Sequence, residues 1–311
     1  MGALDHLGLA LWTMQSTAAR PGLHSALYRR FGEEARLAEE LGFGALWVGE
    51  HRVWYDGWCP APLHVLAYVA GLTARIRLGT AMYLVPQHHT SAAARTIATL
   101  RELSGGRFEL GAGLGYRDPE FDALGVRRDR RGRLMDEGLD ALEAAWSAAS
   151  VPAPRIWMGG MAPVAIGRAA RRGYGLMLPQ TLTLDQLRRI VDDYRSQGGP
   201  GPIGMLREAW VGEGGDRFAA RVGLHMTEEA GSWWPLKDGF GFGAREQLER
   251  QVARGVGAIA TGPAEEVAAG LRELYDAGVE HVAVRFAFEF VDPQALREQM
   301  LRVAGEVAPL L

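Results

Sequence analysis

The chain has 311 residues, of which 48% are hydrophobic and 23% charged, as in an ordinary soluble globular protein. Its formal net charge of −3 provides no basic field for nucleic acid or an anionic membrane surface, and no apolar run reaches the roughly 18 residues that a membrane span needs. A single cysteine, Cys59, excludes an intramolecular disulfide framework and a multi-cysteine metal cluster. The first residues lack the pattern of a signal peptide, so we expect a cytoplasmic protein.

Short apolar runs alternate with longer amphipathic segments along almost the whole chain. The expected strands cover residues 6–11, 44–48, 76–84, 107–112, 155–158, 174–178, 203–211 and 281–286. The expected helices cover residues 23–41, 62–72, 91–103, a longer region to about 149, 162–172, 184–195, 263–276 and 293–307. Eight strand–helix units imply parallel strands joined by right-handed crossovers. This α/β pattern predicts one domain over residues 1–311, a (β/α)₈ TIM barrel. The alternative, an open Rossmann-like sheet, lacks the G-x-G-x-x-G motif after its first strand.

One connection interrupts this rhythm, between the seventh strand and the helix that begins near residue 263. Residues 216–229 are expected to be helical, whereas residues 231–243 are rich in glycine and aromatic side chains. Long connections in compact domains are usually functional or disordered. We therefore expect an insertion after the seventh strand. Its segment 231–258 is either a surface excursion or subunit contact, or a lid over a bound organic molecule.

The carboxyl ends of the strands form the active-site face of such a barrel. His51 follows the second strand and is the best acid–base candidate, because only histidine has an unperturbed pKa near neutrality. Alternatively, its ring only hydrogen-bonds a backbone carbonyl. Glu50 either orients His51 or forms a buried ion pair with an arginine, and we favour the ion pair. His88 and His89 are adjacent, so in an extended backbone they point in opposite directions and do not chelate one ion; no metal site is expected.

A strand–glycine–helix junction lies at Gly159, Gly160 and Met161. Backbone N–H groups at a helix start, with no Cβ atoms in the way, suit a phosphate group. The alternative is a tight turn without a ligand. The motifs of nucleoside triphosphatases, α/β-hydrolases and zinc proteases are absent from the sequence.

Several segments resemble the bacterial luciferase-like, flavin-dependent oxidoreductases. They are Glu50-His51 after the strand Ala-Leu-Trp-Val-Gly, residues 76–86, the Ser-Gly-Gly-Arg-Phe run 104–108 leading into 111–116, and residues 121–125, 131–137, 155–160, 168–179, 262–267 and 278–282. The segments agree with the family in order and spacing over nearly the whole chain.

The resemblance implies a TIM barrel that binds reduced FMN, or a deazaflavin coenzyme in some branches. The flavin ring would lie near Ala81, Met82, Gly113, Leu178 and Pro179. The phosphate would bind the backbone of the glycine junction at residues 159–161. The resemblance further implies a non-proline cis peptide within residues 79–82, and His51 as a base or proton donor at the reactive edge of the flavin. A homodimer is also expected from it.

The chain departs from the family at the expected phosphate site. Leu114 stands where some members have an arginine, and residues 161–164 are Met-Ala-Pro-Val where several members have hydroxylated side chains. Phosphate binding would then depend on backbone amides, which suits weak binding of an exchangeable flavin. The choice between FMN and deazaflavin stays open.

The main functional hypothesis is a monooxygenase that uses O₂ and reduced FMN, supplied by a separate flavin reductase, to oxygenate a small organic substrate. Trp12, Met14, Trp54 and Trp233 are candidate walls of the substrate pocket, although tryptophan more often fills a core. The first alternative is a deazaflavin-dependent dehydrogenase or reductase, which transfers hydride without O₂. The second is a non-catalytic flavin-binding accessory protein.

Overall fold

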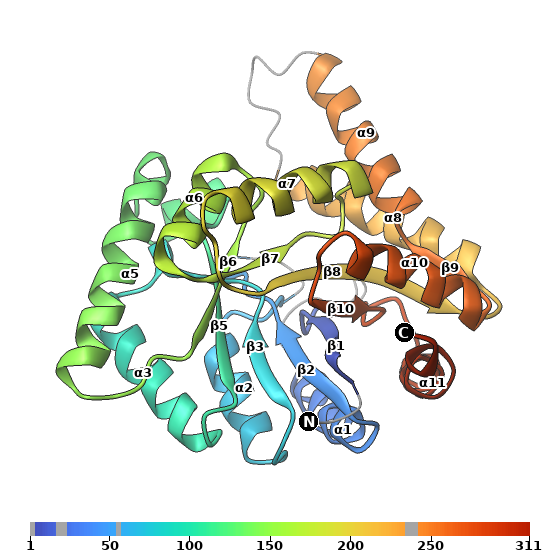
Figure 1. Ribbon diagram of the computed structural model, residues 1–311, viewed down its shortest axis with the longest axis horizontal. Coiled ribbons are helices and arrows are strands. Elements are labelled where there is room, and N and C mark those ends of the chain that lie inside the picture. Colours follow the sequence, from blue (N-terminus) through green and yellow to red (C-terminus); the bar gives the residue numbers. More distant parts are fainter. Residues whose placement is uncertain (1–3, 17–23, 54–56, 234–241) are drawn as a thin grey trace.

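Eight parallel strands form a closed barrel in the computed structural model (Figure 1). The structure describes residues 4–16, 24–53, 57–233 and 242–311, and the side chains of Leu11 and of residues 228–248 lie outside this description. The barrel strands are β1 (Leu4–Trp12), β2 (Phe43–Val48), β3 (Arg77–Thr80), β5 (Phe108–Gly113), β6 (Arg155–Gly159), β7 (Gly175–Leu178), β8 (Ile203–Val211) and β10 (His281–Arg285). Pairing between β10 and β8 closes the ring, with Ala283 beside Leu206. The predicted TIM barrel is confirmed.

Helices follow the strands and cover the outside of the barrel (Figure 1). They are α1 (Ser25–Glu40), α2 (Pro62–Ala70), α3 (Thr90–Leu103), α4 (Asp118–Ala123), α5 (Arg131–Ala148), α6 (Pro163–Arg172), α7 (Leu184–Ser196), α10 (Ala264–Asp276) and α11 (Pro293–Arg302). The insertion after β8 adds α8 (Gly215–Trp233) and α9 (Phe242–Gly257), which pack against each other beside the barrel. Two short strands, β4 (Tyr83–Leu84) and β9 (Ala260–Gly262), extend the sheet beyond the ring.

Local sequence signals explain where several helices begin and end. Thr183 and Gln186 form a capping box at the start of α7, and the Asp292 carboxylate accepts two backbone N–H bonds at the start of α11. Helix α6 ends at Gly173, whose φ of 70° lies in the left-handed region that glycine adopts without a steric penalty. Each signal lies within a few residues of the helix end that it marks. The ranges of these helices could therefore be predicted from the sequence.

Two expectations about elements need correction. The expected single strand 76–84 is divided into β3 and β4. A cis peptide between Ala81 and Met82 lies between them, and β4 pairs with β5. The helix expected over residues 216–229 is longer, because α8 runs from Gly215 to Trp233, and a second helix, α9, begins at Phe242. The pairing of β9 with the end of β8 was not predicted.

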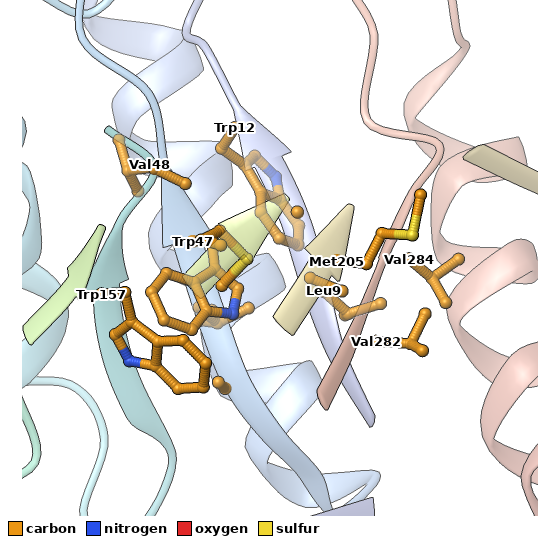
Figure 2. Packing of buried hydrophobic residues seen from close by; sticks show 14 of the residues in the cluster. Leu9, Trp12, Trp47, Val48, Trp157, Met205, Val282 and Val284 are labelled. Carbon is orange, nitrogen blue, oxygen red and sulfur yellow. The ribbon is translucent and has the colours of Figure 1, made fainter. Parts of the chain in front are cut away.

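Aromatic side chains and one neutral histidine fill the barrel interior. Trp47 and Trp157 pack edge to face with their ring centroids 5.7 Å apart (Figure 2). Burial lowers the pKa of His281 to about 3, so its ring is neutral and its Nε2 accepts the indole N–H of Trp47 at 3.0 Å. The Trp157 N–H donates to Glu109 at 2.7 Å. These side chains therefore fill the barrel interior with packed and hydrogen-bonded groups.

Gly79 makes room for the Trp47 ring, and its replacement tests this packing. A Cβ atom at this position would lie 2.2 Å from Cε3 of Trp47, far inside van der Waals contact. We expect Gly79→Ala to lower the free energy of unfolding by about 1–3 kcal/mol, measured by urea denaturation. Gly132→Ala in α5 is the matched control, because nothing lies within 4 Å of its added Cβ atom. Equal stability of the two variants would contradict this account of the core.

Candidate active site

A cavity of about 490 Å³ opens at the carboxyl ends of the barrel strands. Its volume falls within the range of roughly 300–1,000 Å³ that is usual for small-molecule sites. The predicted catalytic and cofactor-binding residues all line this cavity: His51, Ala81, Met82, Gly113, Gly159, Gly160, Met161, Leu178 and Pro179. Residues from five separate strand ends thus converge on one space.

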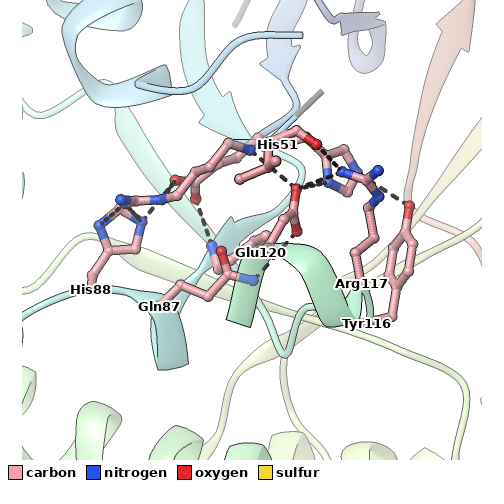
Figure 3. Close-up of polar contacts among 10 residues, drawn as sticks. His51, Gln87, His88, Tyr116, Arg117 and Glu120 are labelled. Atoms are coloured by element: carbon pink, nitrogen blue, oxygen red, sulfur yellow. Dashed lines mark hydrogen bonds and ion pairs between the residues drawn. The ribbon is translucent and has the colours of Figure 1, made fainter. Parts of the chain in front are cut away.

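His51 lies just beyond β2 and is held at both ring nitrogens (Figure 3). Its Nδ1 lies 2.8 Å from Oε1 of Glu120, and its Nε2 lies 3.1 Å from the hydroxyl of Tyr116. The Trp58 ring packs edge-on against the imidazole at 4.5 Å. Because a carboxylate only accepts hydrogen bonds, Nδ1 carries the proton that donates to Glu120. Nε2 is thereby left to the Tyr116 hydroxyl: it accepts from that hydroxyl when the ring is neutral and donates to it when the ring is protonated.

Glu120 on α4 is fully buried and is the common acceptor of this cluster. Besides His51, it accepts the backbone N–H of Arg52 at 3.1 Å, a guanidinium N–H of Arg117 at 3.4 Å and the amide of Gln87 at 3.4 Å. Burial alone would raise the pKa of Glu120, but the hydrogen bond and charge of His51, the Arg52 N–H and the Arg117 charge together lower it. The carboxylate is therefore ionised and holds the His51 ring in place.

Glu50 does not contact His51 but forms a second cluster beside it. Its Oε1 accepts hydrogen bonds from Arg52 Nε at 3.3 Å and from His88 Nε2 at 2.8 Å, while its Oε2 accepts the backbone N–H of Leu84 at 2.8 Å. The favoured interpretation of Glu50, a buried carboxylate paired with an arginine, is confirmed. His88 is thereby tied to this ion pair.

The cavity floor is formed by Met82 and the glycines around it. The predicted non-proline cis peptide within residues 79–82 is confirmed at Ala81–Met82. A Cβ atom on Gly113 would lie 2.6 Å from Cβ of Met82, and one on Gly159 would lie 2.5 Å from its Sδ. Met82 occupies the space that Cβ atoms on these glycines would need, and it lines the cavity.

The junction between β6 and α6 has the features expected of a phosphate cradle. Gly160 has φ +135°, a conformation that other residues rarely adopt. The N-cap residue Ala162 offers no side-chain hydrogen bond to the helix, and the Met161 side chain is 48% exposed at the rim. With no hydroxyl or cationic side chain in residues 159–164, an anion here would depend on backbone N–H groups. The chemistry of this segment fits a flavin phosphate held by the main chain.

Two of the predicted substrate-pocket residues, Trp12 and Met14, lie together outside the lining of the main cavity. Trp12 donates its indole N–H to Glu34 at 2.7 Å and packs against Phe31. Neither Trp12 nor Met14 lines the cavity; with other residues they line a separate small hollow. A substrate contact by these two residues stays a prediction, and the hydrogen bond to Glu34 on α1 fixes the Trp12 ring outside the main cavity lining. Trp54 lies outside the described residues, and so does the side chain of Trp233.

The insertion supplies part of the cavity wall instead. Met226 of α8 and Gln251 and Val252 of α9 line it. Helix α8 is tied to the segment after β10, because His225 Nδ1 lies 3.0 Å from Oε1 of Glu289. The positions of Gln251 and Val252 are consistent with an insertion that covers a ligand, and a lid at residues 231–258 stays a prediction.

Sequence reasoning missed the residues that complete the site from distant parts of the chain. Glu120 and Gln87 had no signal, because no local pattern joins a carboxylate to a histidine 69 residues away. Tyr116 and Arg285 lie at the ends of predicted strands, and this position was the sequence signal that could have identified them as site residues. Within the described residues, no group of three or more His, Cys, Asp or Glu is placed to hold a metal ion. Nor does that part of the chain contain a helix long and apolar enough to cross a membrane.

The fold and the site together define a class of protein. It is an α/β barrel with a ligand cavity at its mouth and a buried histidine–carboxylate pair. Residues 10–202 match the luciferase-like monooxygenase family, and because this is more than half of the chain, the chain belongs to that family. The resemblance inferred from sequence is thus confirmed.

Two relatives illustrate how far the sequence match extends. The uncharacterised protein y4vJ of Sinorhizobium fredii is 32% identical over 185 residues, which cover 52% of this chain and 53% of that protein. The 4-hydroxyprotoasukamycin monooxygenase of Streptomyces nodosus subsp. asukaensis is 37% identical over 122 residues, which cover 39% of this chain and 32% of the relative. The chain therefore matches about half or less of the length of these relatives.

Solved structures share the fold over nearly the whole chain. The monooxygenase RslO1 of Streptomyces bottropensis superposes with a TM-score of 0.80 at 24% identity, covering 97% of this chain and 98% of that one. The oxygenating constituent of 3,6-diketocamphane monooxygenase of Pseudomonas putida, in complex with FMN, gives 0.74 at 19% identity and coverages of 94% and 95%. An F420-dependent secondary alcohol dehydrogenase with an F420–acetone adduct gives 0.71 at 16% identity, covering 90% and 93%.

Proposed function

We propose that this protein is a monooxygenase that takes reduced FMN from a separate reductase and uses O₂ to oxygenate a small organic substrate. The observation that carries the proposal is the placement of the His51–Glu120 pair in the same cavity as the cis Ala81–Met82 floor and the Gly159–Gly160 junction. Family membership and relatives named as monooxygenases support it. A homodimer remains part of the proposal.

The residues that would hold FMN lie along one side of the cavity. Ala81, Met82, Leu178 and Pro179 would support the ring, and the backbone of residues 159–161 would bind the phosphate. Reduced FMN, when bound, supplies the electrons with which O₂ is activated. The protein contributes position, a largely apolar lining and control of protons.

His51 is the group in this site suited to move a proton. Glu120 keeps a proton on Nδ1 and stabilises the positive charge that forms when Nε2 is protonated. Nε2 can then accept a proton from a group in the cavity or return one to it. The Tyr116 hydroxyl, 3.1 Å from Nε2, occupies the position from which such a proton would come or leave.

A deazaflavin-dependent hydride transfer is the second candidate function. One support is the F420-dependent dehydrogenase of the same fold. The other is that residues 159–164 carry no hydroxyl or cationic side chain that could bind a phosphate, so only backbone groups of this segment can discriminate between the two cofactors. A flavin-binding accessory role is the third candidate. It would use the same cavity without turnover.

Cofactor titration of the purified protein tests these functions against one another. We expect reduced FMN to bind, and the protein to change the rate at which that flavin is reoxidised by O₂, as followed by stopped-flow absorbance. A deazaflavin should bind at least tenfold more weakly, which corresponds to about 1.4 kcal/mol. Tighter binding of deazaflavin, with hydride transfer that needs no O₂, would replace the monooxygenase by the second function. FMN binding with reoxidation identical to that of free flavin would favour the accessory role.

A further inference from the structure

The insertion closes part of the cavity with a methionine that is seated against a glycine. Met226 of α8 lines the cavity and is half-buried. Gly255 lies on α9, and a Cβ atom at this position would lie 2.5 Å from Cε of Met226 and 2.9 Å from its Sδ. The end of the Met226 thioether therefore occupies the space that any side chain at position 255 would need.

A second glycine makes the reciprocal contact between the same two helices. A Cβ atom at Gly223 of α8 would lie 2.9 Å from Cγ2 of Val256 on α9. Each helix thus presents a glycine to a side chain of the other helix. Because of these two glycines, α8 and α9 pack at closer range than side chains at both positions would allow. This packing fixes where the end of Met226 lies.

Arg207 of β8 anchors the end of α9 to the barrel. It is 5% exposed, and its Nη1 donates to the carbonyl oxygen of Ala258 at 2.8 Å and to that of Gln180 at 3.3 Å. Ala258 directly follows α9, where the last carbonyl groups have no partner within the helix, and Gln180 lies in the cavity wall after β7. Strand β9 then pairs with β8 immediately beyond this point. These contacts hold α9 against the barrel, so the helix is not free to move outward.

A side chain at position 255 would therefore displace Met226 and not the helix. Gly255 has no positive φ, so alanine can adopt its backbone conformation. The atoms in the way are the flexible end of the Met226 side chain, which moves at a lower cost than backbone does. The empty space beside Met226 is the cavity. The displaced thioether would turn into that space and shorten it.

We propose that Gly255 is a specificity-determining residue for the organic substrate: it lets Met226 fold back against α9 and so sets the length of ligand that the cavity accepts. Met226 and Val252 present apolar side chains to this part of the cavity, so the end of the ligand that reaches it is a hydrocarbon. The word substrate rests on the proposed function, whereas the length limit does not require turnover.

Binding of a homologous series of uncharged alcohols measures this limit. The probes are 1-butanol, 1-hexanol, 1-octanol, 1-decanol and 1-dodecanol, and their dissociation constants are measured by ligand-observed NMR on the full chain, with and without FMN. Each buried methylene should strengthen binding about fourfold until the ligand reaches Met226, after which the affinity should level off. In Gly255→Ala we expect the affinity to level off at a shorter alcohol, with about tenfold weaker binding of the longest alcohol that the wild type accommodates.

A double variant identifies Met226 as the side chain that Gly255 controls. Met226→Ala should move the levelling-off point to a longer alcohol, because it shortens this side chain to a methyl group. Adding Gly255→Ala to Met226→Ala should then change binding by less than about twofold, since the group that it displaces is gone. Gly257→Ala is the matched control on the same helix, because no described atom lies within 4 Å of its added Cβ atom, and it should behave as the wild type.

The same levelling-off point in the wild type, Gly255→Ala and Met226→Ala would overturn the proposal. A wild type whose affinity rises through the whole series, or that binds none of these alcohols, would overturn it as well. An equal effect of Gly255→Ala with and without the Met226 side chain would show that Met226 is not the group displaced, which also contradicts the proposal. A protein that keeps the length limit but leaves the reoxidation of reduced FMN unchanged would retain this specificity site and lose the monooxygenase function. Faster or slower reoxidation without a length limit would remove this inference alone.

Discussion

Replacing His51 with alanine is expected to lower turnover by about 100-fold or more, with a much smaller effect on FMN affinity. The expectation follows from general acid–base catalysis, in which a positioned side chain contributes roughly 10² to 10⁴ in rate. His51 is suited to this because Glu120 at 2.8 Å fixes its tautomer, so that Nε2 is available to exchange a proton. Turnover is measured as protein-dependent oxidation of reduced FMN by O₂, and binding by flavin titration.

Two comparisons separate a catalytic His51 from a structural one. Added imidazole should restore part of the lost rate in His51→Ala, since a free base can occupy the vacated space. His64→Ala is the control, because His64 is an exposed residue of α2, outside the cavity lining. Unchanged turnover in His51→Ala would remove this residue from the mechanism.

Replacing Glu120 with alanine is expected to have the largest effect on stability. The change would leave the buried Arg117 and His51 without their shared carboxylate, and breaking a buried charged pair costs about 3–5 kcal/mol. Glu120→Gln retains the shape but not the charge and should lose less. The free energy of unfolding is measured by urea denaturation at pH 7. A loss below about 1 kcal/mol in Glu120→Ala would contradict the role of Glu120 as the centre of the cluster.

The pH dependence of stability provides a second measurement on Glu120. Because its pKa is lower in the folded protein than the ordinary value of 4.5, its contribution is complete above that value and is lost as the pH falls through the folded pKa. The wild type should therefore lose stability on acidification below about pH 4.5 more steeply than Glu120→Gln. Glu102→Gln is the control, because Glu102 forms an exposed pair with Arg101 that contributes about 0–1 kcal/mol. Parallel pH profiles for the wild type and Glu120→Gln would count against the depressed pKa.

We expect Glu120 to affect catalysis through His51 alone, as a positioning residue. Glu120→Gln should lower turnover less than His51→Ala does, and the double variant should be no worse than His51→Ala alone. Additive losses would indicate that Glu120 has a separate role.

The parts of the site that could be predicted are those that lie at the end of a recognisable strand. His51, the Ala81–Met82 segment and the Gly159–Gly160 junction line one cavity, because the barrel geometry brings every strand end to one face. Trp12 also ends a strand but does not line that cavity. Its indole N–H donates to Glu34 on α1, and a strand-end position does not specify a rotamer.

Periodicity and turn chemistry are local properties, so the order of the residues was sufficient for the eight barrel strands, for the helices with their caps and for the family resemblance. The hydrogen-bond partners of His51 depend on chain segments that meet only when the barrel closes. Glu120 lies 69 residues from His51, and Arg285 meets Glu208 across the strand pair that completes the ring. The hydrogen bonds and charges that these segments bring together lower the pKa of Glu120 against the effect of its burial, and they do not exist before the chain has packed.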